Sequence, residues 1–520
     1  MKNDNLYKNF NTLKDNEDWN NSYKIYNENI DIFSVVIDRL VHKYNLTFIE
    51  ARDSILYEIF SINYTRINRK RFFSFNKVKW FFIYIFTLLT VLMSGIVDFF
   101  LSLGQKKISR DILYEEMWSQ KSWYSRFYKY IDRELDKNRY KISIFYIHPG
   151  VTKDFGTVSI ENWDGDIINH RHKSLLFSFK KSFLLFKNDF LYAFNLYFLS
   201  KDINVTLLYL RILKKMVTYS SQVKGVKATI LIGAGDYYWN PIKYIEYKKS
   251  IKNIILLQHN FKNEYLHNRL FQYCDYYYAH SQNAIDKLEG IDFSKKYSVG
   301  SFQLIPFLTE ISNKNKYDIL FLNQTVEDDL KNIYPNFNQN SLKESYYILI
   351  KNLKIYLEKY SDCRVLYIAK GETINSEPSL RVKRELEYLD NIEFIGAYGK
   401  DTFDLVNKSK LIINMYSSVG FEAYGLDKKV LWINYDHCCS EFKYDVEQEE
   451  LHVIINDLSY EAFEKRVNLL LSDNKEVDEH YKKLKEKYMN IQGNPAKIVA
   501  DKINEILKSK NENKNPRLHP

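Results

Sequence analysis

Cysteine is scarce in this chain of 520 residues, and the four cysteines are not spaced as in metal centres or disulfide scaffolds. Cys274, Cys363, Cys438 and Cys439 include no C-x-x-C pair, and the adjacent pair does not suit joint ligation of one metal ion. A reduced, cytoplasmic protein is therefore expected. The polar N-terminus, MKNDNLYKNFNTLKDNEDWNN, does not have the form of a signal peptide.

Nucleic-acid-binding motifs are also missing. The chain has 75 basic and 65 acidic residues, a net charge of +10, which would suit nucleic acid, an anionic membrane or a nucleotide phosphate. No zinc finger or RNA-recognition signature accompanies the charge. We therefore expect no nucleic-acid partner. The basic residues clustered at 66–79 are expected to suit an anionic membrane instead.

One long apolar run, at residues 80–103, is long enough to cross a bilayer as a helix. Asp98 interrupts it, and basic residues flank both ends. A simple span would hold the N-terminal flank in the cytoplasm and place the large C-terminal part outside, away from activated sugars. A monotopic hairpin bending at Ser94-Gly95 or an interfacial helix on the inner face of the cytoplasmic membrane avoids that conflict. A buried core helix is the alternative.

Most of the chain has the alternating pattern of an α/β protein. Short apolar runs separated by helical stretches predict parallel sheets that are covered on both faces. The expected strands form two series: 142–147, 228–232, 253–257, 276–279 and 297–299, then 318–322, 364–368, 392–395, 411–414 and 429–433.

The polar run SNKNK within 306–316 separates the two series and is the expected linker. Residues 1–138 have helix-like apolar spacing, including 112–135. We therefore expect two Rossmann-like doubly wound parallel-sheet domains with a helical N-terminal region. The expected division is a helical region at 1–138 containing the segment 80–103, a first Rossmann-like domain at 139–312, a second at 313–473, C-terminal helices at 474–509 and a disordered tail at 510–520.

Polar residues follow the strands of the second series. Open parallel sheets bind ligands beyond the carboxyl ends of their strands. Gln324 and Thr325 follow the first of these strands, and Lys370, a candidate to neutralise a phosphate, follows the second. These three residues are predicted to bind the ligand of this domain.

The most informative segment is 411–434, in which a strand, the turn MYSSVG, a helix and another strand follow each other. Ser417 or Ser418 can cap the helix, and its free N–H groups would form an anion site suited to phosphate. Gly420 would allow close approach of the ligand, and Glu422 could accept ribose hydroxyl groups. An ordinary capped βα unit would have the same short pattern.

The wider stretch NIEFIGAYGKDTFDLVNKSKLIINMYSSVGFEAYGLDKKVLWIN resembles the donor-binding half of GT-B glycosyltransferases. It is similar to bacterial surface-polysaccharide transferases, including the CDP-glycerol glycerophosphotransferase-like and Kdo-transferase-like groups. The resemblance covers about 228–434 and is clear over 390–434. It implies a nucleotide-sugar substrate whose diphosphate and ribose are held by Ser417, Ser418, Gly420 and Glu422.

The first α/β half supplies candidates for the acceptor side. Gln258-His259-Asn260 follows a strand, and a similar Q-H-G occurs in those transferases, although Asn260 replaces the glycine. His259 is the expected general base, since neutral imidazole can take the acceptor hydroxyl proton. Asp236 would orient His259 or bind the acceptor. His280, after the next strand, would contact the donor phosphates or the acceptor.

The predicted activity is metal-independent transfer of a sugar from a nucleotide donor to a surface polysaccharide, such as capsule or lipopolysaccharide, or to a lipid-linked acceptor. No cofactor is expected beyond the nucleotide-sugar substrate. Asp164-Gly165-Asp166 is a D-x-D, the metal signature of the other main glycosyltransferase fold, but no following pattern supports that fold. The alternatives are CDP-linked glycerophosphate transfer and a non-catalytic, membrane-attached scaffold of polysaccharide assembly.

Overall fold

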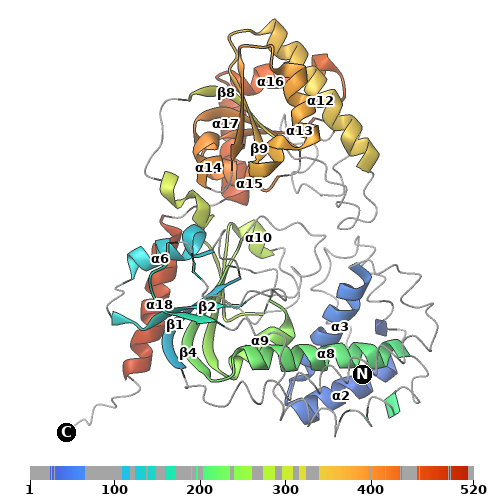
Figure 1. The fold of residues 1–520 in the computed structure, drawn as a ribbon, viewed down its shortest axis with the longest axis vertical. Helices are drawn as coiled ribbons and strands as arrows, with labels where there is room; N and C mark the ends of the chain where they lie inside the picture. Colours follow the sequence, from blue (N-terminus) through green and yellow to red (C-terminus); the bar gives the residue numbers. More distant parts are fainter. Residues whose placement is uncertain are drawn as a thin grey trace.

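The chain folds into two α/β units, each built on one parallel sheet (Figure 1). A helical layer lies beside the N-terminal unit, and the C-terminal helix returns to that unit. The expected fold class is confirmed. The computed structural model describes residues 30–64, 108–117, 123–135, 139–147, 162–169, 203–234, 239–259, 273–286, 295–308, 315–323, 339–397, 400–415, 417–433, 457–489 and 493–512, with single residues and pairs between them.

The N-terminal unit contains a seven-stranded sheet in the order β3-β2-β1-β4-β5-β6-β7. Every neighbouring pair is parallel. Because the chain builds outward on both sides of β1, the order of connection reverses between β1 and β4. The strands are β1 (Ile108–Glu116), β2 (Ile142–Tyr146), β3 (Ile167–Asn169), β4 (Val226–Gly233), β5 (Ile251–Leu257), β6 (Tyr276–Ala279) and β7 (Lys295–Ser298).

Strand β1 corrects the expectation that residues 1–138 are helical. It lies between β2 and β4, although its sequence, ISRDILYEE, carries four charged residues. Leu113 contacts the core on one face of the sheet, whereas Ile112 and Tyr114 contact the core on the other. The apolar spacing of this segment therefore reflects two buried faces of a strand. The helical layer and the sheet overlap in sequence.

Helices cover both faces of this sheet. The π-helical turn η2 (Tyr124–Tyr128), α6 (Lys129–Glu134) and α18 (Pro495–Glu512) pack on one face, and α9 (Pro241–Lys248) packs on the other. Helix α9 begins after Asn240, which caps it by accepting the Lys243 N–H, and proline occupies the first turn. Helices α2 (Ile30–Tyr44), α3 (Phe48–Tyr64) and α8 (Ile203–Gln222) form a separate apolar core against α9.

The C-terminal unit has a six-stranded parallel sheet in the order β10-β9-β8-β11-β12-β13. Its reversal point lies between β8 and β11. One apolar core joins the sheet to the surrounding helices. The elements are β8 (Tyr317–Leu322), α12 (Gln339–Lys359), β9 (Val365–Lys370), η7 (Gly371–Asn375), α13 (Glu377–Leu386), β10 (Ile392–Ala397), α14 (Lys400–Asn407), β11 (Ser409–Asn414), α15 (Val419–Gly425), β12 (Lys429–Ile433), β13 (Ile454–Ile455), α16 (Tyr460–Leu471) and α17 (Lys475–Tyr488).

Two segments of chain connect the units. The first contains the 3₁₀ turn η6 (Phe302–Phe307), and the second runs from α17 to α18. They meet at Ile491: a Cβ added to Gly300 would lie 2.5 Å from its side chain, and one added to Gly425 would lie 3.1 Å away. Gly300 also has φ +85°, a conformation that favours glycine. The two connections and α15 are therefore closely packed.

The domain boundaries other than the helical region remain predictions, with one adjustment at the C-terminus. Helix α18 runs from Pro495 to Glu512, so residues 510–512, predicted to belong to the disordered tail, are helical. The segment 80–103 lies outside the described residues. Within the described part of the chain, no helix is long and apolar enough to cross a membrane.

Candidate functional site

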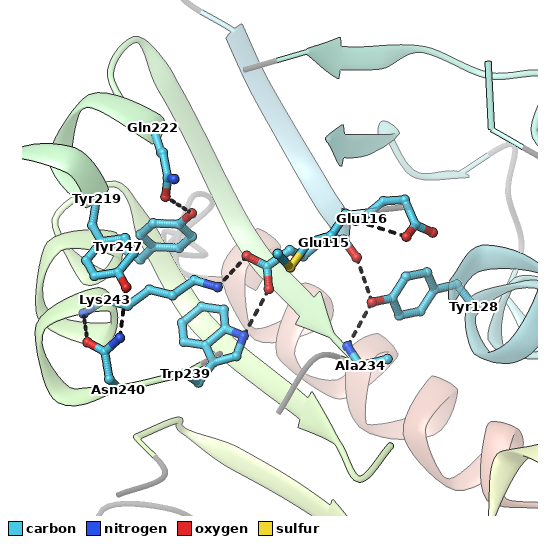
Figure 2. A network of polar contacts seen from close by, with 11 residues as sticks. Glu115, Glu116, Tyr128, Tyr219, Gln222, Ala234, Trp239, Asn240, Lys243 and Tyr247 are labelled. Atoms are coloured by element: carbon cyan, nitrogen blue, oxygen red, sulfur yellow. Dashed lines mark hydrogen bonds and ion pairs between the residues drawn. The ribbon is translucent and has the colours of Figure 1, made fainter. Parts of the chain in front are cut away.

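The reversal point of the N-terminal sheet contains a buried ion pair (Figure 2). Glu115, near the end of β1, accepts the Trp239 indole N–H at 2.9 Å and lies 2.8 Å from the Lys243 ammonium. The two charged side chains are 0% and 4% exposed. Burial lowers the pKa of Lys243, and the carboxylate of Glu115 opposes that effect. The Lys243 nitrogen also lies 4.2 Å from the centre of the Trp239 ring.

Glu115 contributes to holding both ends of the loop between β4 and α9, one through its carbonyl and the other through its carboxylate. At the β4 end, the Ala234 N–H donates to the Tyr128 hydroxyl, which donates to the Glu115 carbonyl. At the α9 end, Trp239 and Lys243 are held by the Glu115 carboxylate (Figure 2). The predicted residue Asp236 belongs to this loop but lies outside the described residues, so its role remains a prediction.

Gln258 and His280 join the ends of β5 and β6. The Gln258 side-chain oxygen accepts the His280 N–H at 2.8 Å, and both residues are buried. Ser281 then caps α10 (Gln282–Asp286) by accepting the Ala284 N–H. Since His280 is only 1% exposed, contact with a substrate would require rearrangement, and its predicted role remains a proposal.

His259 is the more accessible of the two predicted histidines. It is partly buried, follows β5 at the carboxyl edge, and lies against aromatic rings that come after β1. Its ring centre is 5.4 Å from that of Phe127 and 6.2 Å from that of Trp123. These contacts limit the orientation of the imidazole, so the geometry suits a base that must meet an acceptor at a fixed position.

In the C-terminal unit, the turn after β11 is closed by its own polar groups. Asn414 accepts the Ser417 N–H at 2.9 Å and donates to the Ser417 carbonyl at 2.8 Å. The Ser417 hydroxyl accepts the Val419 N–H, whereas Ser418 makes no side-chain cap. Ser418 therefore occupies the N-cap position without a side-chain bond, whereas Ser417, one residue earlier, satisfies the N–H of the first helix residue.

The start of α15 corrects the anion-site argument. The Gly420 N–H bonds to the Ser417 carbonyl, and the N–H groups of Phe421 and Glu422 bond to the Ser418 carbonyl. With Val419 bonded to Ser417, these four donors are already occupied. Binding of a phosphate by free N–H groups of this seven-residue helix is therefore not supported. A donor role for Ser417 and Ser418 now depends on their partly exposed hydroxyl groups and remains a proposal.

Packing accounts for a glycine at position 420, and close approach of a ligand there stays a prediction. A Cβ added at this buried position would lie 2.3 Å from the Asn414 amide nitrogen and 2.7 Å from the Trp432 ring. Both neighbours are themselves buried, with Asn414 bonded to Ser417 and Trp432 to Tyr424. The glycine permits β11, α15 and β12 to approach one another.

Gly420→Ala is accordingly expected to destabilise the protein by about 1–3 kcal/mol, the usual cost of overpacking a well-filled core. The midpoint of urea unfolding should fall with little change in slope. Ser418→Ala is the matched control on the same turn, and it should have little effect because that side chain forms no cap. Equal stability of Gly420→Ala and wild type would contradict the packing explanation.

Glu422 has protein partners in place of the predicted ribose. Its side chain is buried, and one carboxylate oxygen accepts from the Ser301 hydroxyl at 2.7 Å and from the Gln303 amide at 3.2 Å. Burial raises the pKa of Glu422 to about 7, against the lowering effects of the Ser301 hydrogen bond, the Arg126 charge and the Gln303 hydrogen bond. A ribose contact stays a prediction that would have to compete with these bonds.

The remaining predicted residues are placed only in part. Lys370 is the last residue of β9 and pairs with Ala397 of β10, at the predicted carboxyl edge. Nothing is described of its side chain. Gln324 and Thr325 lie outside the described residues, directly after Asn323, whose amide donates to Ser379. Their assignment to the donor remains a proposal.

The D-x-D motif has a partner in the structure. Asp166 forms an ion pair of 2.9 Å with Arg110 of β1, and its carbonyl accepts the N–H of Ile144. Gly165 packs on Trp163. In the described part of the chain, no group of three His, Cys, Asp or Glu side chains is arranged to hold a metal ion.

The sequence patterns do not single out the buried residues Glu115, Lys243, Ser301 and Gln303 or the partly buried Arg126. One signal was available. Glu115 and Glu116 are the last residues of β1, just as Gly233 is the last residue of the neighbouring strand β4. Had β1 been recognised, two adjacent carboxylates at the end of a central strand would have marked the reversal point.

No protein-family model matches the chain, and the comparison with curated proteins finds no significant match. Distant structural similarity to enzymes of the GT-B fold is found. A UDP-GlcNAc 2-epimerase from Methanocaldococcus jannaschii is 12% identical, with TM-score 0.42, over 76% of this chain and 100% of its own. The wall teichoic acid polymerase TagF is 12% identical, with TM-score 0.46, over 84% and 99%. A glycosyltransferase from Rickettsia africae is 14% identical, with TM-score 0.39, over 78% and 100%. The chain is thus a remote structural match to GT-B enzymes.

Proposed function

We propose that this protein transfers a sugar from a nucleotide-sugar donor to a hydroxyl group of a surface polysaccharide or glycolipid. The observation that carries the proposal is the meeting of the two carboxyl edges at Glu422. This residue lies in the first turn of α15, the helix that follows β11, and its partners Ser301 and Gln303 lie in the connection that follows β7. Since parallel α/β sheets bind ligands at these edges, a donor on one sheet would face an acceptor on the other.

The residues divide by unit. In the C-terminal unit, β8 and β11 flank the reversal point, so Gln324, Thr325 and Ser417 follow the strands at which a ligand is expected. Lys370 ends the neighbouring strand β9, where an ammonium would attract the donor diphosphate. Ser418 would add a hydroxyl contact. We assign donor binding to these residues. Gly420 is assigned to packing between β11, α15 and β12, and Glu422 to the contact between the two units.

In the N-terminal unit, His259 is the proposed general base. The acceptor oxygen forms a bond to the anomeric carbon, and the bond from that carbon to the donor phosphate breaks. The acceptor proton passes to the His259 imidazole, and the nucleotide leaves with the bonding electron pair. Lys370 would stabilise the negative charge that develops on the phosphate. Asp236 and His280 are proposed to orient the base and to contact the phosphates.

Glycerophosphate transfer from a CDP-linked donor is the second candidate, because Gln258-His259 resembles the Q-H pair of the CDP-glycerol glycerophosphotransferase-like group. The two reactions differ in the bond that breaks. Transfer of a sugar from a nucleoside-diphosphate sugar releases the nucleoside diphosphate, whereas transfer of glycerophosphate from CDP-glycerol releases CMP. The released nucleotide therefore distinguishes glycerophosphate transfer from transfer of a nucleoside-diphosphate sugar. A CMP-linked sugar also releases CMP and is distinguished by testing that donor separately.

A donor-binding screen tests the proposal. UDP-, CDP- and CMP-linked sugars and CDP-glycerol are each added to the full-length protein, and the melting temperature is measured. A donor at a hundred times its dissociation constant stabilises the native state by about 2.7 kcal/mol. We expect one donor class to raise the melting temperature, Lys370→Ala to weaken that shift, and the same donor to be hydrolysed slowly. The absence of both stabilisation and hydrolysis with every class would favour the scaffold alternative.

A further inference from the structure

The contacts of Glu422 form a continuous polar link between the two α/β units. Its oxygen accepts from Ser301 and Gln303, both buried residues of the connection between β7 and β8. The Gln303 oxygen in turn accepts from Arg126 at 3.2 Å. Gln303 therefore bonds to both units: its oxygen accepts from Arg126 of η2 in the N-terminal unit, and its amide donates to Glu422 of α15 in the C-terminal unit.

The surroundings leave little room for this link to rearrange while the units stay together. Gly425, at the end of α15, would place an added Cβ 2.5 Å from Leu304 and 2.7 Å from Met489. Leu304 belongs to η6, and Met489 begins the second connection. Both connections therefore press on the helix that carries Glu422. A change in how the units sit must change the contacts of this carboxyl group.

Among the described residues, one charged group and two neutral hydrogen-bond donors act on the Glu422 carboxyl group. Arg126 of η2 supplies the charge that acts on it, Ser301 and Gln303 of the connection are neutral, and α17 presents Tyr488 to α15. Desolvation is the largest influence and raises the pKa of Glu422 to about 7. A hydrated glutamate titrates near 4.5. The ionised form is thus favoured when the units separate and water reaches the carboxylate.

We propose that Glu422, Ser301, Gln303 and Arg126 form a pH-sensitive lock that holds the two α/β units in one arrangement. With Glu422 protonated the lock is closed, and ionisation favours its opening. The sign follows from linkage: the arrangement that binds the proton more tightly is favoured at low pH and loses its advantage as pH rises toward 7. The lock depends on contacts between the units and not on the proposed reaction, so either can hold without the other.

The expected effect can be given as a change in the opening equilibrium. With a pKa of about 7 when locked and 4.5 when hydrated, opening should become about tenfold more favourable between pH 6 and pH 8. Hydrogen exchange of the full-length protein measures this as protection of residues 301–308 and 419–425, after correction for the intrinsic pH dependence of exchange. Protection of β5, within one sheet, should not change in the same way.

Three variants separate the lock from ordinary packing. Glu422→Gln keeps the shape and the acceptor oxygen but cannot ionise, so protection of both segments should become independent of pH. Arg126→Met removes the opposing charge and should move the transition to higher pH while leaving Glu422 able to titrate. Ser301→Ala should lower protection at every pH, because it removes a hydrogen bond to both forms.

The pattern of outcomes decides the proposal. Identical pH dependence in wild type and Glu422→Gln, or wild-type protection that does not change from pH 6 to pH 8, would overturn it. If Glu422→Gln does not fold, Arg126→Met still tests the lock through the position of the transition. An unchanged position in that variant would contradict the assigned role of Arg126 and the lock with it.

Discussion

Glu115→Ala is expected to lower the free energy of unfolding by about 3–5 kcal/mol, the usual cost of leaving one partner of a buried ion pair alone. The Lys243 ammonium is 4% exposed and would lose the carboxylate 2.8 Å away. The Trp239 indole N–H would lose its acceptor at the same time. Because both partners hold the α9 end of the loop after β4, the loop should lose its anchor as well as its ion pair.

The controls separate charge from packing. Glu115→Met/Lys243→Met leaves neither charge of this pair buried alone, so its destabilisation should be much smaller than that of Glu115→Ala. Asp501→Ala removes a pair in which both side chains are more than half exposed and should have little effect. Urea unfolding followed by two probes gives the midpoints, since a chain with two α/β units need not unfold in one step. A single variant as stable as the double variant would contradict a net role for the pair.

A large part of the fold could be predicted from the sequence because buried parallel strands form apolar runs. IILL in β5 and LIIN in β11 stand out in this way. Strand β1 does not stand out, because its sequence ISRDILYEE is rich in charge. Those charges are accommodated by ion pairs, Arg110 with Asp166 and Glu115 with Lys243. Each partner is distant in sequence, so a local pattern cannot show that such a charged segment is buried at the centre of a sheet.

The candidate site shows the same limit. The turn at Ser417 can be recognised in the sequence because its residues are neighbours, and the Ser417 hydroxyl accepts the N–H of Val419 at the start of the helix. The predicted ribose contact of Glu422 takes no account of Ser301 and Gln303, because these partners are more than a hundred positions away in the sequence. Gly420 likewise faces Trp432, on the next strand. Sequence patterns located this segment correctly, but only tertiary contacts distinguish a ligand contact from a packing contact.

His259→Ala is expected to lower the rate of glycosyl transfer by about 10²–10⁴-fold, the range typical for loss of a general base. Donor binding should be retained, because the donor is assigned to the C-terminal unit. The contacts of the imidazole with Phe127 and Trp123 fix its orientation, and a methyl group cannot replace the proton acceptor. The rate constant under donor saturation and the melting shift with donor measure the two effects separately.

Two further measurements distinguish a base from a residue that only supports the edge of the sheet. Added imidazole should restore part of the activity of His259→Ala, because a free base can occupy the space left by the side chain. The loss of rate at acidic pH, where a histidine base is protonated, should be weaker in the variant. His480→Ala, on α17 beside Tyr481, is the matched control and should retain full turnover. Full activity of His259→Ala, or a loss explained entirely by weaker donor binding, would assign the base elsewhere, with Asp236 the next residue to test.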